Sequence, residues 1–323
     1  MNEVCKELYK IGIVPVIAID NAADAEPLAK ALIEGGLPAA EVTFRTDAAE
    51  EAISIISKKF PEMIVGAGTV LNSEQADRAK KAGAKFIVSP GFNRSNVEYI
   101  QSIGVPVVPG TATPGEVEQA IELGLDCVKL FPAEQNVGIA KIKAMAAPYT
   151  KMHFMPTGGI NKNNLCDYLS FDRVFCCGGS WMVKKDMIAE GRFDEIKALA
   201  ADAVKSMLGF KLVHIGINSN DKEEADKVAN MFSMLFGFEK DEREASVFAG
   251  KEIEVMAGGG RGTKGHIAIG TNSVDRAVYH LSQKGVEFDE SSYKYESNGN
   301  LKFAYLKDEI GGFAVHLIKN KRE

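Results

Sequence analysis

Short apolar runs and amphipathic stretches alternate along the first two-thirds of the chain. Each apolar run is rich in Val and Ile, and helical spacing of the apolar positions follows, as in 114–124. This alternation predicts parallel strands joined by helices. The predicted strands are 14–19, 39–45, 64–70, 86–91, 105–111, 126–133, 153–159 and 173–180, and a final helix covers 193–207.

Eight strands separated by helices favour an α/β fold, a (β/α)8 TIM barrel. In such a barrel, functional side chains lie at the carboxyl ends of the strands. A doubly wound open sheet is the alternative topology for the same alternation of strands and helices.

The pattern changes after residue 208. A strand (211–218) and a helix (222–237) precede several shorter strands, and a second round of one helix and several strands follows. This weak internal repeat predicts an α+β domain. We therefore expect two domains, 1–208 and 209–323, with almost no flexible linker between them.

Composition excludes two classes of partner. The chain has 323 residues, of which 46% are hydrophobic and 25% charged, with a net charge of −6. It has no basic stripe for a nucleic acid, and its longest apolar runs fall far below the ~20 residues that span a bilayer. No signal-peptide core precedes the first strand. With five cysteines and no CxxC pair, we expect a cytoplasmic protein with reduced thiols.

A lysine interrupts the apolar run "CVKLFPAE" (127–134). Burying an unpaired ammonium is costly, so Lys129 either has its head in water at a strand end or is meant to lose its proton. Alternation places Glu41, Thr43 and Arg45 on one face of the second strand, which would be the inner face of a barrel. These residues form either a site or an ion pair that only fills the barrel.

Glycines end several predicted strands, in "GAGTV", "SPG", "PTGG" and "CGGS". After the seventh and eighth strands of a barrel, such turns either expose backbone N–H groups to a phosphate or serve as ordinary tight turns.

The segments "EVTFRT", "VGAGTVL", "SPG", "VKLFPAE", "PTGGI" and "GGSW", in this order and spacing, resemble the bacterial 2-keto-3-deoxy-6-phosphogluconate aldolases. These class I aldolases also include 4-hydroxy-2-oxoglutarate aldolase activity, and the resemblance covers about residues 5–205. It implies reversible cleavage of the keto acid to pyruvate and an aldehyde, without a cofactor, by a chain that is commonly a trimer. The residue at the end of the first strand departs from the family, because Asp20 stands where some members have a basic residue.

The resemblance also implies roles for individual residues. Lys129 would form the Schiff base, which requires an unprotonated amine and explains its apolar setting. Glu41 would move protons. Arg45 and Thr69 would bind the pyruvyl carboxylate. The remaining substrate-binding residues would be Pro90, Phe131 and Thr157 around the carbon skeleton, and Gly158, Gly159 and Ser180 at the phosphate.

Four of the five histidines follow residue 210, and three of them lie on predicted strands. His214, His266 and His316 each face away from apolar neighbours, as Glu254 does, so one face of a sheet would present all four. Such a set suits a divalent transition metal. Alternatively, these histidines are solvated strand residues, or they are relics in a domain kept for dimer packing. His280 is expected on the surface of a helix.

Residues 211–319 resemble the vicinal oxygen chelate family, which includes glyoxalase I and has paired βαβββ units. The resemblance implies metal ligation by His214, Glu254, His266 and His316, the last standing where glutamate is usual. A different class of function is also open, in which a non-catalytic barrel binds a keto acid and the second domain is a metal-binding sensor.

Overall fold

The computed structural model describes residues 1–320 and divides the chain into two compact units, Met1–Met207 and Leu208–Glu323. Residues 321–323, which the second predicted domain includes, lie outside the described part. Each unit is treated separately below. Among the described residues, no helix combines the length and the apolar character that a membrane crossing requires.

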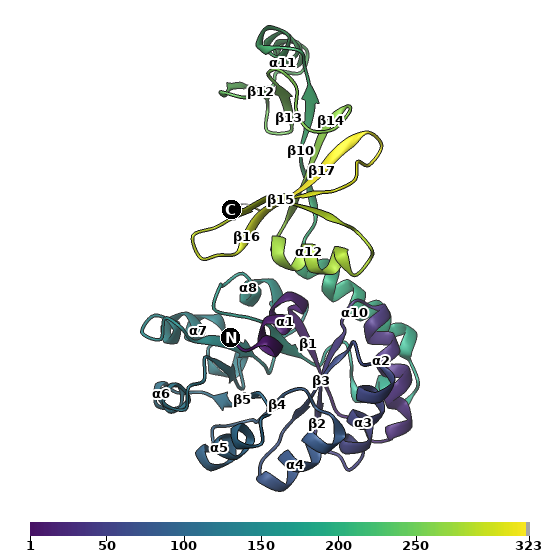
Figure 1. Cartoon of the computed structure of the whole chain (residues 1–323), viewed down its shortest axis with the longest axis vertical. Helices are drawn as coiled ribbons and strands as arrows, with labels where there is room; N and C mark the ends of the chain where they lie inside the picture. The colour runs from purple at the N-terminus through teal and green to yellow at the C-terminus, as the bar shows by residue number, and fades with distance from the viewer. Residues whose placement is uncertain (321–323) are drawn as a thin grey trace. The chain divides into compact units, whose positions relative to one another are not determined.

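The first unit is a curled parallel sheet surrounded by helices (Figure 1). Its strands run in the order β5-β4-β3-β2-β1-β9 and β6-β7-β8, and bridges from Phe154 to Val174 and from Thr157 to Gly178 join β8 to β9. The sheet therefore closes into an α/β barrel. The strands are β1 (Ile13–Ile17), β2 (Ala39–Thr43), β3 (Ile64–Gly68), β4 (Ile87–Val88), β5 (Val107–Val108), β6 (Gly110–Thr111), β7 (Cys127–Leu130), β8 (His153–Pro156) and β9 (Cys177–Gly179).

Helices follow the strands and begin with side chains that satisfy their free N–H groups. Thr113 and Glu116 form a capping box with two reciprocal hydrogen bonds at the start of α6. At the start of α4, the side chain of Asn72 accepts one hydrogen bond from the backbone N–H of Gln75. The helices are α1 (Glu3–Ile11), α2 (Ala25–Glu34), α3 (Ala49–Lys59), α4 (Ser73–Ala82), α5 (Arg94–Ser102), α6 (Pro114–Glu122), α7 (Ile139–Ala146), α8 (Leu165–Leu169), α9 (Lys185–Ala189) and α10 (Phe193–Leu208).

All eight predicted strand positions of the barrel are occupied, but most strands are shorter than predicted. The fifth is interrupted at Pro109, which has no N–H group to donate and separates β5 from β6. The backbone C=O of Pro109 still accepts a hydrogen bond from Lys129 N–H at 2.8 Å, so the neighbouring strand keeps its place.

The second unit is one eight-stranded sheet with two helices, built from two rounds of strand, helix and three strands. Its strand order is β11-β12-β13-β10-β14-β17-β16-β15. The first round is β10 (Lys211–Asn218), α11 (Lys222–Phe236), β11 (Lys240–Glu242), β12 (Ser246–Ala249) and β13 (Ile253–Met256). The second is β14 (Gly265–Thr271), α12 (Val274–Ser282), β15 (Phe288–Tyr295), β16 (Leu301–Leu306) and β17 (Phe313–Lys319).

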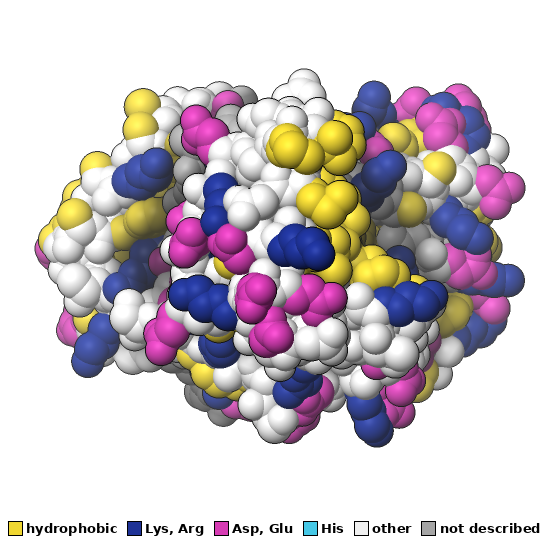
Figure 2. Space-filling view, turned by 90° about the horizontal axis from the view of Figure 1, so that it is seen from above, with side chains coloured by type: hydrophobic (Ala, Val, Ile, Leu, Met, Phe, Trp, Pro, Cys, Tyr) yellow, Lys and Arg dark blue, Asp and Glu magenta, His cyan; other side chains and the backbone are white. Residues whose placement is uncertain are grey.

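Helix α11 buries only one of its two apolar faces. Ala225 and Ala229 pack against Val247 and Val255 of the sheet. On the other side, Figure 2 views the side of the molecule on which α11 lies and shows hydrophobic side chains gathered among charged ones. The exposed large apolar residues in and next to this helix are Met231, Met234, Leu235, Phe236 and Phe238.

The expectation for His280 was wrong. This residue lies on α12, but it is 4% exposed rather than on the surface. Helix α12 is strongly amphipathic. Its buried residues are Val274, Arg276, Ala277 and His280, and three of them, Val274, Ala277 and His280, follow a three-residue spacing along one face. Because histidine is polar, the pattern of apolar residues does not include it, and the sequence therefore did not predict that this position is buried.

Candidate functional site

Lys129 and Glu41 meet inside the barrel. Lys129 lies on β7 and Glu41 on β2, and the ammonium Nζ donates a hydrogen bond to Oε1 of the carboxylate at 3.1 Å. Both side chains are buried, with 6% and 1% of their surfaces exposed. The second carboxylate oxygen, Oε2, has no hydrogen-bond partner among the described residues. An amine, its counter-ion and one free carboxylate oxygen therefore share an enclosed space.

The end of β3 makes room for this pair. A Cβ atom on Gly68 would lie 2.3 Å from Glu41 Oε1, so only glycine allows the carboxylate to occupy its position. The next residue, Thr69, has a φ of 58°, a conformation that β-branched residues rarely adopt. Such strain is concentrated at functional sites, where the surrounding structure holds the residue in place.

Other predicted substrate residues lie at or just after the carboxyl ends of their strands. The Phe131 ring lies with its centroid 5.4 Å from Lys129 Nζ and is partly exposed. Thr157 follows β8, and its buried hydroxyl has no partner among the described residues. Arg45 lies beyond the end of β2, in a turn, and its Nε donates to the Thr43 hydroxyl at 3.1 Å. Pro90 follows β4 and is partly buried.

The turns after β8 and β9 carry the predicted phosphate residues. Gly158 and Gly159 have φ values of 98° and 80°, and Ser180 directly follows β9 with its side chain exposed. Glu134, which sequence analysis assigned no role, lies against this turn, because a Cβ on Gly159 would lie 2.5 Å from its Cγ. The hydroxyl of Tyr168 donates to Glu134, and burial together with this bond raises the pKa of Tyr168.

In the second unit, the predicted metal ligands lie on one face of the sheet. Strand register aligns Glu254 with Gly216 and His266 in one row. The adjacent row contains His214, which pairs with Ala268. Ala268 in turn pairs with His316. Because residues in register point to the same side, the four predicted ligands share a face.

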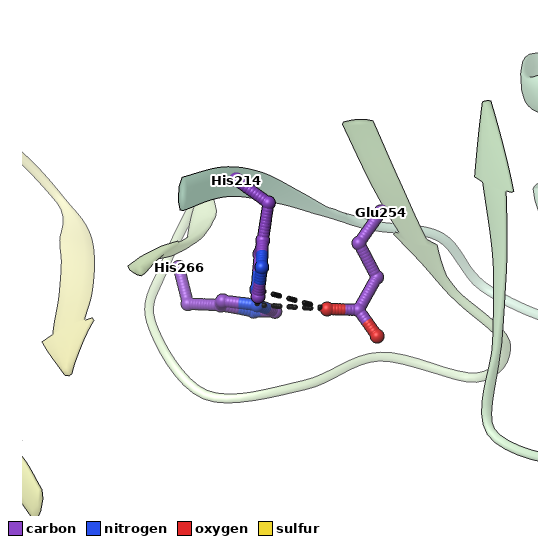
Figure 3. Close-up of side chains that lie close together, drawn as sticks. All are labelled: His214, Glu254 and His266. Carbon is purple, nitrogen blue, oxygen red and sulfur yellow. Dashed lines mark hydrogen bonds and ion pairs between the residues drawn. The ribbon is translucent and has the colours of Figure 1, made fainter. Parts of the chain in front are cut away.

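Three of these side chains converge (Figure 3). Oε2 of Glu254 lies 3.2 Å from Nε2 of His214 and 3.2 Å from Nε2 of His266, and the two Nε2 atoms are 3.0 Å apart. Gly216 permits this approach, because a Cβ there would lie 2.0 Å from Cε1 of His266. Two imidazoles and a carboxylate are donors that Zn²⁺ and other transition metals accept, so the residues fit a divalent ion.

The surroundings keep the carboxylate charged and one imidazole neutral. Burial alone would raise the pKa of Glu254, but hydrogen bonds from His214, His266 and Ser246 outweigh it and hold that pKa far below its usual range. Burial and the nearby rings of His266 and His214 lower the pKa of His316 to about 3. The ring of His316 lies 5.2 Å from that of His266, next to the converging donors but outside their group.

Comparison with known proteins decides the family of the first unit. The family model for KDPG and KHG aldolase matches residues 2–199. The chain belongs to this aldolase family. A 2-dehydro-3-deoxy-phosphogluconate aldolase of Treponema pallidum is 46% identical over 205 residues, which cover 64% of this chain and 98% of that protein. The KHG/KDPG aldolase of Escherichia coli K12 is 43% identical, with 60% and 91% covered.

Solved aldolase structures agree with the fold of the barrel. A KDPG aldolase from Legionella pneumophila, with pyruvate captured as a covalent carbinolamine intermediate, matches with a TM-score of 0.60 and 36% identity over 62% of this chain and 97% of that one. The Zymomonas mobilis aldolase with 3-phosphoglycerate matches with a TM-score of 0.57 and 40% identity, covering 63% and 95%. The matched aldolase family model ends before the second unit.

Proposed function

We propose that the barrel reversibly cleaves 2-keto-3-deoxy-6-phosphogluconate to pyruvate and glyceraldehyde 3-phosphate through a Schiff base on Lys129. The observation that carries this proposal is the buried contact between Lys129 and Glu41. A buried amine in contact with a carboxylate can pass a proton to it, and a Schiff-base nucleophile needs such a partner because only the neutral amine attacks a ketone.

The proposed steps use Lys129 as the nucleophile and Glu41 as the proton carrier. Neutral Lys129 Nζ adds to the C2 carbonyl carbon. The resulting oxygen takes one proton from the nitrogen and a second from a general acid and leaves as water, which gives the protonated imine. A base then removes the proton of the C4 hydroxyl, the C3–C4 bond breaks, and its electrons pass to the imine. Glu41 lies within hydrogen-bond distance of Nζ and has a free Oε2 to carry protons in these steps. Protonation of C3 and hydrolysis release pyruvate.

Substrate binding in this proposal uses the two ends of the site. The guanidinium of Arg45 and the hydroxyl of Thr69 bind the pyruvyl carboxylate, while Pro90, Phe131 and Thr157 line the carbon skeleton. The backbone of Gly158 and Gly159, together with Ser180, receives the phosphate. This list follows the family resemblance, and the location of all eight residues at strand ends supports it.

The acid at the end of the first strand does not stand alone. Asp20 Oδ2 forms an ion pair with Lys185 Nζ at 2.8 Å, so the negative charge that departs from the family pattern is compensated by the first residue of α9. This pair removes the main objection to a phosphorylated substrate. Cleavage of 4-hydroxy-2-oxoglutarate to pyruvate and glyoxylate, which needs no phosphate site, is a second activity of the same lysine chemistry.

Steady-state kinetics with the two substrates test this proposal. We expect pyruvate release from both, with a higher kcat/KM for the phosphorylated one, and no turnover by Lys129→Ala. Near-wild-type cleavage by Lys129→Ala would end the Schiff-base assignment. The matched control is Lys151→Ala, which removes an exposed lysine next to β8 and should retain full activity.

For the second unit, we propose a glyoxalase-like domain that holds one divalent transition metal. His214, Glu254 and His266 are the ligands that converge, and His316 is the predicted fourth, with a buried Nδ1 that has no partner among the described residues. When bound, the ion would polarise an oxygen ligand as a Lewis acid. Elemental analysis should find about one metal per chain and none in the double variant His214→Ala/His266→Ala, and metal-free wild-type protein would contradict the assignment.

A further inference from the structure

Three cations are held against aromatic rings on the sheet face that carries the proposed metal ligands. The rings surround the histidines: that of Phe248 lies 5.8 Å from His214, and those of Phe303 and Tyr305 lie 4.6 and 4.9 Å from His316. The stacked pairs are Arg243 on Phe248 at 3.9 Å, Arg261 on Tyr305 at 4.6 Å and Lys294 on Phe303 at 5.1 Å. No carboxylate other than Glu254 belongs to the group of converging donors.

Lys294 differs from the two arginines in having no acidic partner. Arg243 pairs with Asp241 at 2.9 Å and Arg261 with Asp289 at 2.6 Å, so their charges are largely compensated. No carboxylate among residues 1–320 forms an ion pair with Lys294. Its strand neighbour across the sheet is Phe303, in register, and the ring holds the ammonium above this face.

Tyr305 adds a hydrogen-bond donor to the same place. It lies in register with His316, and its hydroxyl makes no hydrogen bond with any described residue. A phenol carries its proton at neutral pH and can donate it. The phenol of Tyr305 and the ammonium of Lys294 both lie next to the ring of Phe303, whose centroid is 5.2 Å from that of Tyr305 and 5.1 Å from Lys294 Nζ.

The charges around the donors are unbalanced once a metal is present. A divalent ion with one carboxylate ligand and two neutral imidazoles retains one positive charge, and Lys294 adds a second. A neutral ligand would offset neither charge, whereas a carboxylate offsets one of them. A carboxylate also offers two acceptor oxygens, which match the two unused donors, the ammonium of Lys294 and the hydroxyl of Tyr305.

We propose that the sheet face around His214, Glu254 and His266 binds a small organic carboxylate beside the metal, and that Lys294 and Tyr305 receive its carboxylate group. This inference rests on the proposed metal site, but its recognition groups are separate residues on β15 and β16. It gives the second unit a ligand class of its own, distinct from any role of the barrel.

The test uses the full-length protein loaded with Co²⁺, whose d–d absorption bands report only on ligands near the metal. Lactate is the probe, because it has no ketone to react with Lys129, and lactamide is its neutral counterpart. We expect lactate to shift the bands with saturation, and lactamide at the same concentration to leave them unchanged. Equal responses to both compounds, or no response to lactate, would overturn the inference. A response to inorganic phosphate without one to lactate would also overturn it.

Two variants test whether Lys294 and Tyr305 bind the carboxylate of lactate. Lys294→Gln and Tyr305→Phe should each weaken lactate binding, by about tenfold for the lysine, as expected for one lost charge-assisted contact. Lys302→Gln is the matched control, since Lys302 lies on β16 but alternates to the opposite face from Phe303 and should not change the affinity. Unchanged affinity in Lys294→Gln would contradict the proposal. Bound Co²⁺ without a lactate response refutes this inference alone, and absence of Co²⁺ binding refutes the metal site with it.

Discussion

Glu41→Gln separates the proton-transfer role of the glutamate from its role in filling the barrel. In the wild type, Lys129 Nζ lies 3.1 Å from Glu41 Oε1. Glutamine keeps the shape of this side chain, and its amide oxygen can still accept the hydrogen bond from Nζ. It cannot accept and return protons through a carboxylate. The variant therefore removes the proposed chemistry and leaves a well-filled site, since Glu41 is only 1% exposed.

The expected loss follows from the contact with the amine. General acid–base help from a positioned side chain contributes about 10²–10⁴-fold, which corresponds to roughly 3–5 kcal/mol of transition-state stabilisation. We expect kcat to fall by that factor, with a smaller change in KM because Arg45 and the phosphate turn are untouched. Pyruvate release can be followed by coupling to lactate dehydrogenase and NADH, and circular dichroism can verify the fold.

Two further variants make the result specific. Gly68→Ala would place a Cβ 2.3 Å from Glu41 Oε1 and 2.6 Å from its Cγ, so it displaces the carboxylate without changing its charge and should lower kcat in the same direction. Glu98→Gln removes an exposed carboxylate of α5 and should have no effect on turnover. If Glu41→Gln retained kcat within twofold of the wild type, the proton-transfer role would be refuted.

The remaining predictions concern the phosphate end and the second unit. Lys185→Ala leaves Asp20 unpaired near the carboxyl end of β1. The KM for the phosphorylated substrate should therefore rise a few-fold, as expected for the loss of an exposed ion pair, while the KM for 4-hydroxy-2-oxoglutarate stays constant. Equal changes in both KM values would refute this prediction. Gly216→Ala places a Cβ 2.0 Å from His266 Cε1 and should abolish metal content, whereas Gly115→Ala, with nothing within 4 Å of its Cβ, should retain it. Removing metal with a chelator should leave aldolase activity intact, and lost activity would contradict the division of labour between the units.

Much of the fold follows from periodicity, and the deviations have local causes. The spacing of apolar runs predicts every strand position of the barrel, because a parallel strand buried on both faces needs a continuous apolar segment. It overestimates strand length where Pro109 interrupts the ladder. In the second unit β11 has no apolar pattern to mark it, because Lys240, Asp241 and Glu242 are charged. This strand pairs with β12 at the edge of the sheet, where no apolar residue is required.

The site residues could be proposed from sequence, but their contacts could not. Lys129 and Glu41 are 88 positions apart, and only closure of the barrel brings β7 opposite β2. The space that Gly68 leaves for the carboxylate and the backbone conformation of Thr69 depend on that closure. In the same way, alternation places His316 on the ligand face, but the pattern alone does not show that His214, Glu254 and His266 converge while His316 lies beside them.

Borohydride reduction with pyruvate, followed by peptide mapping, tests the central claim most directly. An imine between pyruvate and the enzyme is reduced to a stable secondary amine, and its position is read from the fragment masses. A covalent adduct on Lys129, absent in Lys129→Ala, is the predicted result. Pyruvate that binds but leaves no adduct on this lysine would show a keto-acid-binding barrel instead of an aldolase, and would contradict the account.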